Sequence, residues 1–151
     1  MDAPVELCPL RARSACHGGE GSAMKLTGRC LCKSLRVELS GPVIRAGHCH
    51  CESCRRATSS PVTTFLSAAR SDVVLTGETL RHFASSPGVR RGFCGNCGSP
   101  MTYETEERPG EIDLYVAALD DASGVTISQH WYWNERVSWL HCQDDLPKRE
   151  G

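Results

Sequence analysis

The sequence predicts one mainly β domain that contains only short helices. Short segments in which apolar and polar residues alternate recur along the chain, and Gly, Pro and Ser turn signals separate them. These segments do not alternate with long helical ones, which argues against a parallel α/β sheet. With 151 residues and 40% hydrophobic content, the chain has the size of one compact domain with its own core.

The domain is predicted over residues 24–151. Residues 1–23 mix Pro, Gly and Ser without a hydrophobic period, so we expect a disordered or loosely attached leader there. No run approaches the roughly 18 apolar residues of a spanning helix, and the N-terminus lacks the apolar core of a secretory signal. We therefore expect a soluble, cytoplasmic protein without a membrane partner.

The first strand is predicted over 34–41, where Leu35, Val37 and Leu39 alternate with polar residues before the Gly41-Pro42 turn. This is the period of a half-buried strand. Further strands are predicted over 62–68, 72–78, 80–86 and 110–119.

Helices are predicted only as short pieces, at 52–58 and at 119–123. The stretch 128–140 is rich in aromatic residues, and we expect it to pack across another sheet. Its tryptophans are interpreted as core residues: Trp131, Trp133 and Trp139.

Seven of the ten cysteines have the spacing of metal ligands. A reducing cytosol favours metal binding over disulfides. A Cys-x-Cys pair, whose side chains share one face if the segment is extended, and a Cys-x-x-Cys knuckle together supply the four thiolates of a structural zinc site. These four cysteines are Cys30, Cys32, Cys94 and Cys97, and the loss of any one should damage the fold.

The middle cluster, Cys49, Cys51 and Cys54, has three potential ligands. Cys49 and Cys51 lie on one face of an extended stretch, and Cys54 follows at the first turn of a short helix, while His50 points away. Three protein ligands and one open position are typical of a catalytic zinc. A fourth ligand from Cys142, His48 or a neighbouring subunit would instead make this a second structural site.

Four stretches carry a resemblance to a known family: GRCLC, GHCHCESCRRAT, SSPGVRRGFCGNCGSPMTY and EIDLYVAALDD. Together they resemble the glutathione-dependent formaldehyde-activating enzymes, also called the centromere-protein-V/GFA domain family, from about Met24 to Pro147. The resemblance implies an Mss4-like fold of several coiled antiparallel sheets organised around two zinc ions. It places the structural zinc on the four-cysteine set and the catalytic zinc on Cys49, Cys51 and Cys54. One departure is Lys33, where the family commonly has Gly.

The resemblance also implies carbon–sulfur lyase chemistry on a thiol such as glutathione and a small aldehyde. Zinc on three thiolates acidifies water less than zinc on three histidines, so an incoming thiolate is the better fourth ligand. Arg55 and Arg56 are the candidate binders of substrate carboxylates. Arg90 and Arg91 are weaker candidates of the same kind.

The sequence also bears on other partners and functions. The basic residues are scattered and aromatic residues make up only 6% of the chain, so no nucleic-acid partner is expected. The sequence allows a homodimer. The alternative function is a noncatalytic, zinc-stabilised binding module, because fold alone does not decide function.

Overall fold

The computed structural model describes residues 25–151; the predicted leader, with Cys8 and Cys16, and Met24 lie outside the described residues. The strands are β1 (Leu26–Arg29), β2 (Arg36–Leu39), β3 (Arg45–Cys49), β4 (Thr63–Ala69), β5 (Val73–Thr76), β6 (Leu80–Ser86), β7 (Val89–Cys94), β8 (Pro100–Thr105), β9 (Glu111–Tyr115) and β10 (His130–Trp131). The helices are α1 (Glu52–Thr58) and the 3-10 helices η1 (Arg70–Asp72), η2 (Val116–Ala118) and η3 (Trp133–Glu135). Within residues 25–151, no helix combines the length and apolar character needed to cross a membrane.

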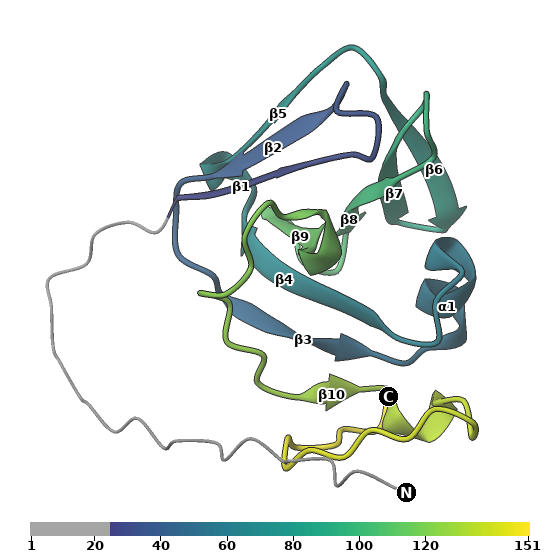
Figure 1. Ribbon diagram of the computed structural model, residues 1–151. Coiled ribbons are helices and arrows are strands. Elements are labelled where there is room, and N and C mark those ends of the chain that lie inside the picture. The colour runs from purple at the N-terminus through teal and green to yellow at the C-terminus, as the bar shows by residue number, and fades with distance from the viewer. Residues whose placement is uncertain (1–24) are drawn as a thin grey trace, which may run out of the picture.

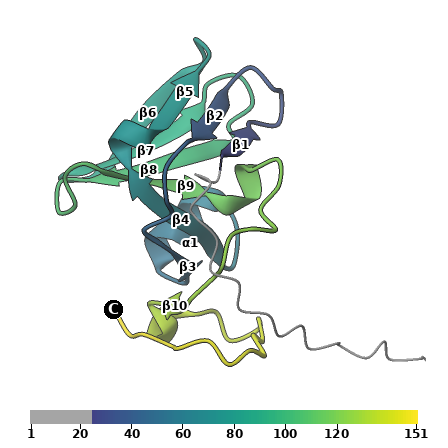
Figure 2. The ribbon, with the colours of Figure 1, turned by 90° about the vertical axis from the view of Figure 1, so that its left-hand side faces the viewer.

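The strands form two sheets, which confirms the mainly β prediction. A three-stranded sheet has the order β1-β2-β5, and a seven-stranded sheet has the order β10-β3-β4-β9-β8-β7-β6. All pairings are antiparallel except that of β10 with β3. Figures 1 and 2 show the small sheet beside β9 and β8 of the large one, with α1 at the end of β3 and β4.

The core is built from both sheets. Leu35, Val37 and Leu39 are all buried while Arg36 and Glu38 are exposed, as the alternating pattern predicts. They join one apolar cluster with residues of the large sheet, among them Leu66, Ala68, Met101, Ile112 and Leu114. Burial of this kind is the main favourable contribution to folding.

Two irregularities shape the hairpin of β6 and β7. The strand register shifts between Ala84 and Ser86, and again between Gly92 and Phe93 in the pairing of β7 with β8. Such bulges bend a strand and increase its twist. The hairpin lies next to α1 (Figure 1), and Arg91 of β7 donates to Ser53 Oγ of α1 at 3.0 Å.

The short strand β10 fastens the C-terminal segment to the large sheet. Trp131 pairs with Cys49 in register, and its indole stacks on Phe65 with a centroid distance of 5.1 Å and an interplanar angle of 10°. Gly47 makes this possible because a Cβ there would lie 2.1 Å from Trp131 Cζ3. The core prediction for the tryptophans is wrong for Trp139, which is 68% exposed; the other two are half-buried.

The helix predicted at 119–123 is also wrong. The chain forms η2 just before it, and Leu119 then bridges to Gly28 of β1. The Asp120 backbone N–H donates to Thr27 O at 2.8 Å, and its carboxylate accepts from Arg29 Nε at 2.7 Å. These contacts hold the segment along β1, so a local helical tendency is overridden by tertiary pairing.

The Cys-x-Cys segment after β1 is a turn and not the extended stretch that we expected. Lys33 N–H donates to Cys30 O, and Cys30 N–H donates to Leu35 O, each at 3.0 Å. The turn places Lys33 in the left-handed region, at a φ of 67°. A residue with a Cβ is strained there, whereas glycine is not. This accounts for the glycine that the family commonly has at this position.

Lys33→Gly should therefore raise the free energy of unfolding by up to about 1 kcal/mol, because relief of the left-handed strain outweighs the added flexibility of the unfolded chain. Chemical denaturation of metal-loaded protein measures it. Arg36→Gly, at the exposed first position of β2, which pairs with Arg29 and Thr76 on the two neighbouring strands, is the control and should lower stability by about 1 kcal/mol. Equal losses in both variants would contradict the explanation.

Candidate metal centres and the adjoining cavity

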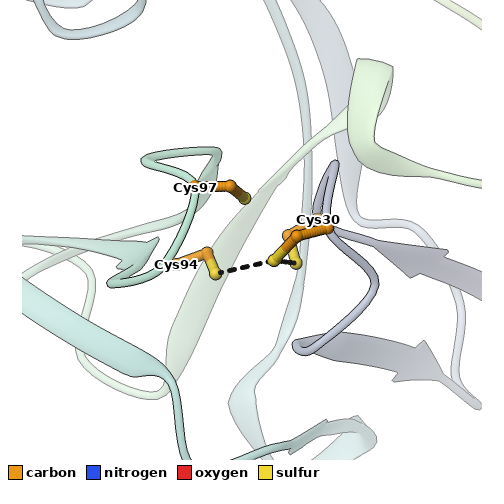
Figure 3. A group of neighbouring side chains, drawn as sticks. Cys30, Cys94 and Cys97 are labelled. Atoms are coloured by element: carbon orange, nitrogen blue, oxygen red, sulfur yellow. Dashed lines mark hydrogen bonds between the residues drawn. The ribbon is translucent and has the colours of Figure 1, made fainter.

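The first candidate site is the four-cysteine group. Cys30 and Cys32 come from the turn after β1, and Cys94 and Cys97 come from the end of β7 and the turn that follows. Figure 3 shows Cys30 opposite Cys94 and Cys97. All four sulfur atoms lie within 4.8 Å of one another. Cys32 Sγ is 3.5 Å from Cys30 Sγ and 3.7 Å from Cys94 Sγ. Tetrahedral coordination with metal–sulfur bonds of about 2.3 Å requires sulfur separations of about 3.8 Å. The group therefore fits one tetrahedral metal ion.

Hydroxyl groups lie next to these sulfurs and favour the ionised form of Cys94 and Cys97. Ser34 Oγ and Thr79 Oγ1 each lie 3.5 Å from Cys94 Sγ, and these hydroxyls lower the pKa of Cys94 to about 5. Ser99 Oγ lies 3.2 Å from Cys97 Sγ and lowers the pKa of that thiol to about 7. Because thiolates are the metal-binding form of cysteine, this surrounding shell prepares the group for a metal ion.

The second candidate site is the three-cysteine group. Cys49 ends β3, Cys51 is the N-cap residue of α1, and Cys54 lies in the first turn of that helix, where its N–H donates to Cys51 Sγ at 3.3 Å. Their sulfurs also lie within 4.8 Å of one another. The thiols of Cys49 and Cys54 lower the pKa of Cys51 by hydrogen bonding, so negative charge settles first on this sulfur.

No fourth donor joins this group from the described part of the chain. Within residues 25–151, the sulfurs gather no further Cys, His, Asp or Glu, so neither His48 nor Cys142 completes the group. Its fourth side faces a cavity. The cavity has a volume of about 660 Å³, and all three cysteines line it.

The histidines next to these cysteines point elsewhere, as the strand alternation predicts. The buried His50 makes a hydrogen bond through Nε2 to His130 Nδ1 at 2.7 Å, and His130 Nε2 lies 3.1 Å from the Asp144 carboxylate. Burial and the neighbouring His130 lower the pKa of His50 to about 4. His50 is thus a neutral residue that supports the turn and not a member of the sulfur group.

The structure brings a different arginine to the sulfurs than the sequence suggested. Arg91, from β7, is only 8% exposed and directs both terminal nitrogens toward Cys54 Sγ, at 3.9 and 3.8 Å. Sequence reasoning ranked it below Arg55 and Arg56 because both follow Cys54 directly. Only the register of Arg91 opposite Tyr103, together with the bend of β7, reveals its position.

Arg55 and Arg56 have other contacts. Arg55 donates to the backbone oxygens of His50 at 2.9 Å and Glu135 at 3.2 Å, which ties α1 to the neighbouring segments. Arg56 is exposed and pairs with Glu52 at 2.8 Å, while it also lies at the rim of a smaller cavity of about 390 Å³. Their role in substrate binding stays a prediction.

The large cavity combines aromatic and charged walls. Beyond the cysteines it is lined by Arg45, Arg91, Arg108, Phe65, Tyr103, Trp131, Tyr132, Glu107 and Glu135, among others. Arg45 is paired with Glu111, and Arg108 with Glu111 and Asp113. Arg91 lines both this cavity and the smaller one.

Comparison with known proteins agrees with this picture. Residues 25–135 match the family described as glutathione-dependent formaldehyde-activating enzyme. An uncharacterized lyase of Schizosaccharomyces pombe is 36% identical over 91 residues, which span 59% of this chain and 66%, or just under two thirds, of that protein. A crystal structure of a Rhodobacter sphaeroides protein shares the fold, with a TM-score of 0.53 and 24% identity over 66% of this chain and 90% of that one. Because the family match contains both cysteine groups, the chain belongs to the glutathione-dependent formaldehyde-activating enzyme family.

Proposed function

We propose that this chain is a zinc-dependent carbon–sulfur lyase that acts on a glutathione-type thiol and a small aldehyde, as an S-hydroxymethylglutathione synthase does. One observation carries the proposal: the three-cysteine group faces a cavity and gains no fourth protein donor from residues 25–151. Family membership and the lyase relative support the reaction class.

Both cysteine groups suit zinc. All seven donors are thiols, which are soft ligands, and the four-sulfur spacing matches a closed tetrahedral site. We assign a structural zinc to the four-cysteine group and a catalytic zinc to the three-cysteine group. When bound there, zinc would supply an open position at which a substrate thiol is held as its thiolate.

The bond changes of the proposed reaction are simple. In the direction of synthesis, the thiolate sulfur donates an electron pair to the aldehyde carbon, and a carbon–sulfur bond forms. The electrons of the carbonyl double bond pass to oxygen, which takes up the proton that the thiol has lost. Cleavage reverses each step. The chain's part is to bind the thiol beside Cys49, Cys51 and Cys54 and to orient the aldehyde in the cavity.

The cavity can accept a peptide-like thiol that carries both signs of charge. Its walls offer guanidinium groups, carboxylates such as Glu107 and Glu135, and aromatic faces such as Tyr132 and Trp131. We propose Arg55 and Arg56 as binders of substrate carboxylates. Of these two, Arg56 has the exposed guanidinium at a cavity rim, whereas Arg55 is held by two backbone carbonyls.

Purified protein should contain two zinc ions per chain. Cys51→Ser should leave one zinc and a folded domain, whereas Cys94→Ser should lower the unfolding temperature by more than about 10 °C, because structural zinc contributes folding free energy directly. Elemental analysis and thermal unfolding measure both effects. Cys142→Ser is the control and should keep both ions. If Cys51→Ser lowered the unfolding temperature as much as Cys94→Ser does, both sites would be structural, as in a binding module.

The exchange of formaldehyde and glutathione with their hydroxymethyl adduct should be faster with the protein than without it. Cys51→Ser should reduce the protein's contribution more than about 100-fold, because it removes a ligand of the reacting centre. NMR exchange spectroscopy measures this rate above the uncatalysed background. Cys142→Ser should match wild type. A Cys51→Ser protein that holds one zinc and retains the wild-type rate would contradict the proposed function.

A further inference from the structure

The buried side chain of Arg91 has every one of its donors engaged. A guanidinium group offers five N–H bonds. Nε donates to Ser85 Oγ at 3.1 Å, and the terminal nitrogens donate to Tyr115 Oη at 3.1 Å and to Ser53 Oγ at 3.0 Å. The two remaining N–H bonds point at Cys54 Sγ. The guanidinium group is therefore fixed in one orientation.

The oxygen atoms that accept from Arg91 all belong to uncharged hydroxyl groups. Three other arginines of the large sheet and its loops are different, because Arg45 pairs with Glu111, Arg90 with Glu104, and Arg108 with Asp113. Among the described residues, no carboxylate forms an ion pair with Arg91. Its positive charge is thus directed at the three-cysteine group alone.

The surroundings keep this charge effective. Arg91 is 8% exposed, so water and salt screen it little. The ring of Tyr103 lies against the guanidinium at 4.8 Å from the centroid, and such a contact stabilises a cation without neutralising it. The charge therefore acts on the three-cysteine group at close range.

We propose that Arg91 is the fixed counter-ion of the three-cysteine centre, a positioning residue that sets the affinity of its open side for anionic ligands. The inference rests on the proposed function only in that the three sulfurs hold a divalent metal. Three thiolates and a divalent ion carry a net charge of −1, which would repel an incoming thiolate. Arg91 brings the sum to zero. The centre can then accept a thiolate while it keeps three sulfur ligands.

The test uses full-length protein loaded with Co²⁺, whose visible absorption reports ligands at the three-cysteine centre. Glutathione and azide are titrated separately, because azide is a small anion that involves no thiol chemistry. Arg91→Gln should raise the dissociation constant of both ligands by about tenfold or more. Arg90→Gln, the neighbouring position on the opposite face of β7, is the matched control and should leave both values unchanged.

Arg91→Lys keeps the positive charge but loses the planar guanidinium group, and it should keep both dissociation constants within about threefold of the wild-type values. Wild-type affinities for both ligands in a folded Arg91→Gln protein would overturn the counter-ion role and leave the proposed function standing. A tenfold loss in Arg91→Lys with an unchanged Co²⁺ spectrum would also overturn it, whether or not the glutamine variant folds. If azide binding depends on Arg91 but wild type binds no thiol, the proposed function fails and the counter-ion role stands.

Discussion

The convergence of four cysteine sulfurs from two distant loops is the constraint on which the rest of the molecule depends. One loop follows β1 in the small sheet and the other follows β7 in the large sheet, so the contact ties the two sheets together at one point. It also fixes the end of β7. Arg91 lies three residues before Cys94 on that strand, and it reaches Ser53 and Cys54 of α1. The two cysteine groups are therefore linked through a single strand.

The surroundings of the two groups differ in a way that suits different tasks. Hydroxyl groups of Ser34, Thr79 and Ser99 lie around the four-cysteine group, whose ligands come from the loop after β1 and from the end of β7. The three-cysteine group instead has a buried arginine on one side, a cavity on another, and the hydrogen-bonded pair of His50 and His130 next to the turn that carries it. A closed shell favours permanent binding, whereas an open one allows exchange.

Sequence reasoning predicted the chemistry of the ligands better than their surroundings. Spacing made four plus three the most economical grouping of the seven cysteines, and the structure brings the sulfurs together in these two groups. It missed the turn at Cys30, where the left-handed Lys33 replaces extended backbone. It also placed a helix at 119–123, where pairing with β1 decides the conformation. Arg91 was underrated because its position depends on strand register and on a bulge, and both are set by tertiary contacts.

The adjacent residues Arg90 and Arg91 show that the site depends on the number of residues along β7. They have the same side chain but opposite surroundings, since one pairs with Glu104 in solvent and the other lies beneath a cavity. In a strand, a shift of one residue exchanges the two faces. Insertion of one residue between Arg91 and Cys94 would turn Arg91 away from the three-cysteine group, while every cysteine remained in the sequence. The number of residues between Arg91 and Cys94 therefore matters to the three-cysteine centre, although neither Gly92 nor Phe93 belongs to either cysteine group.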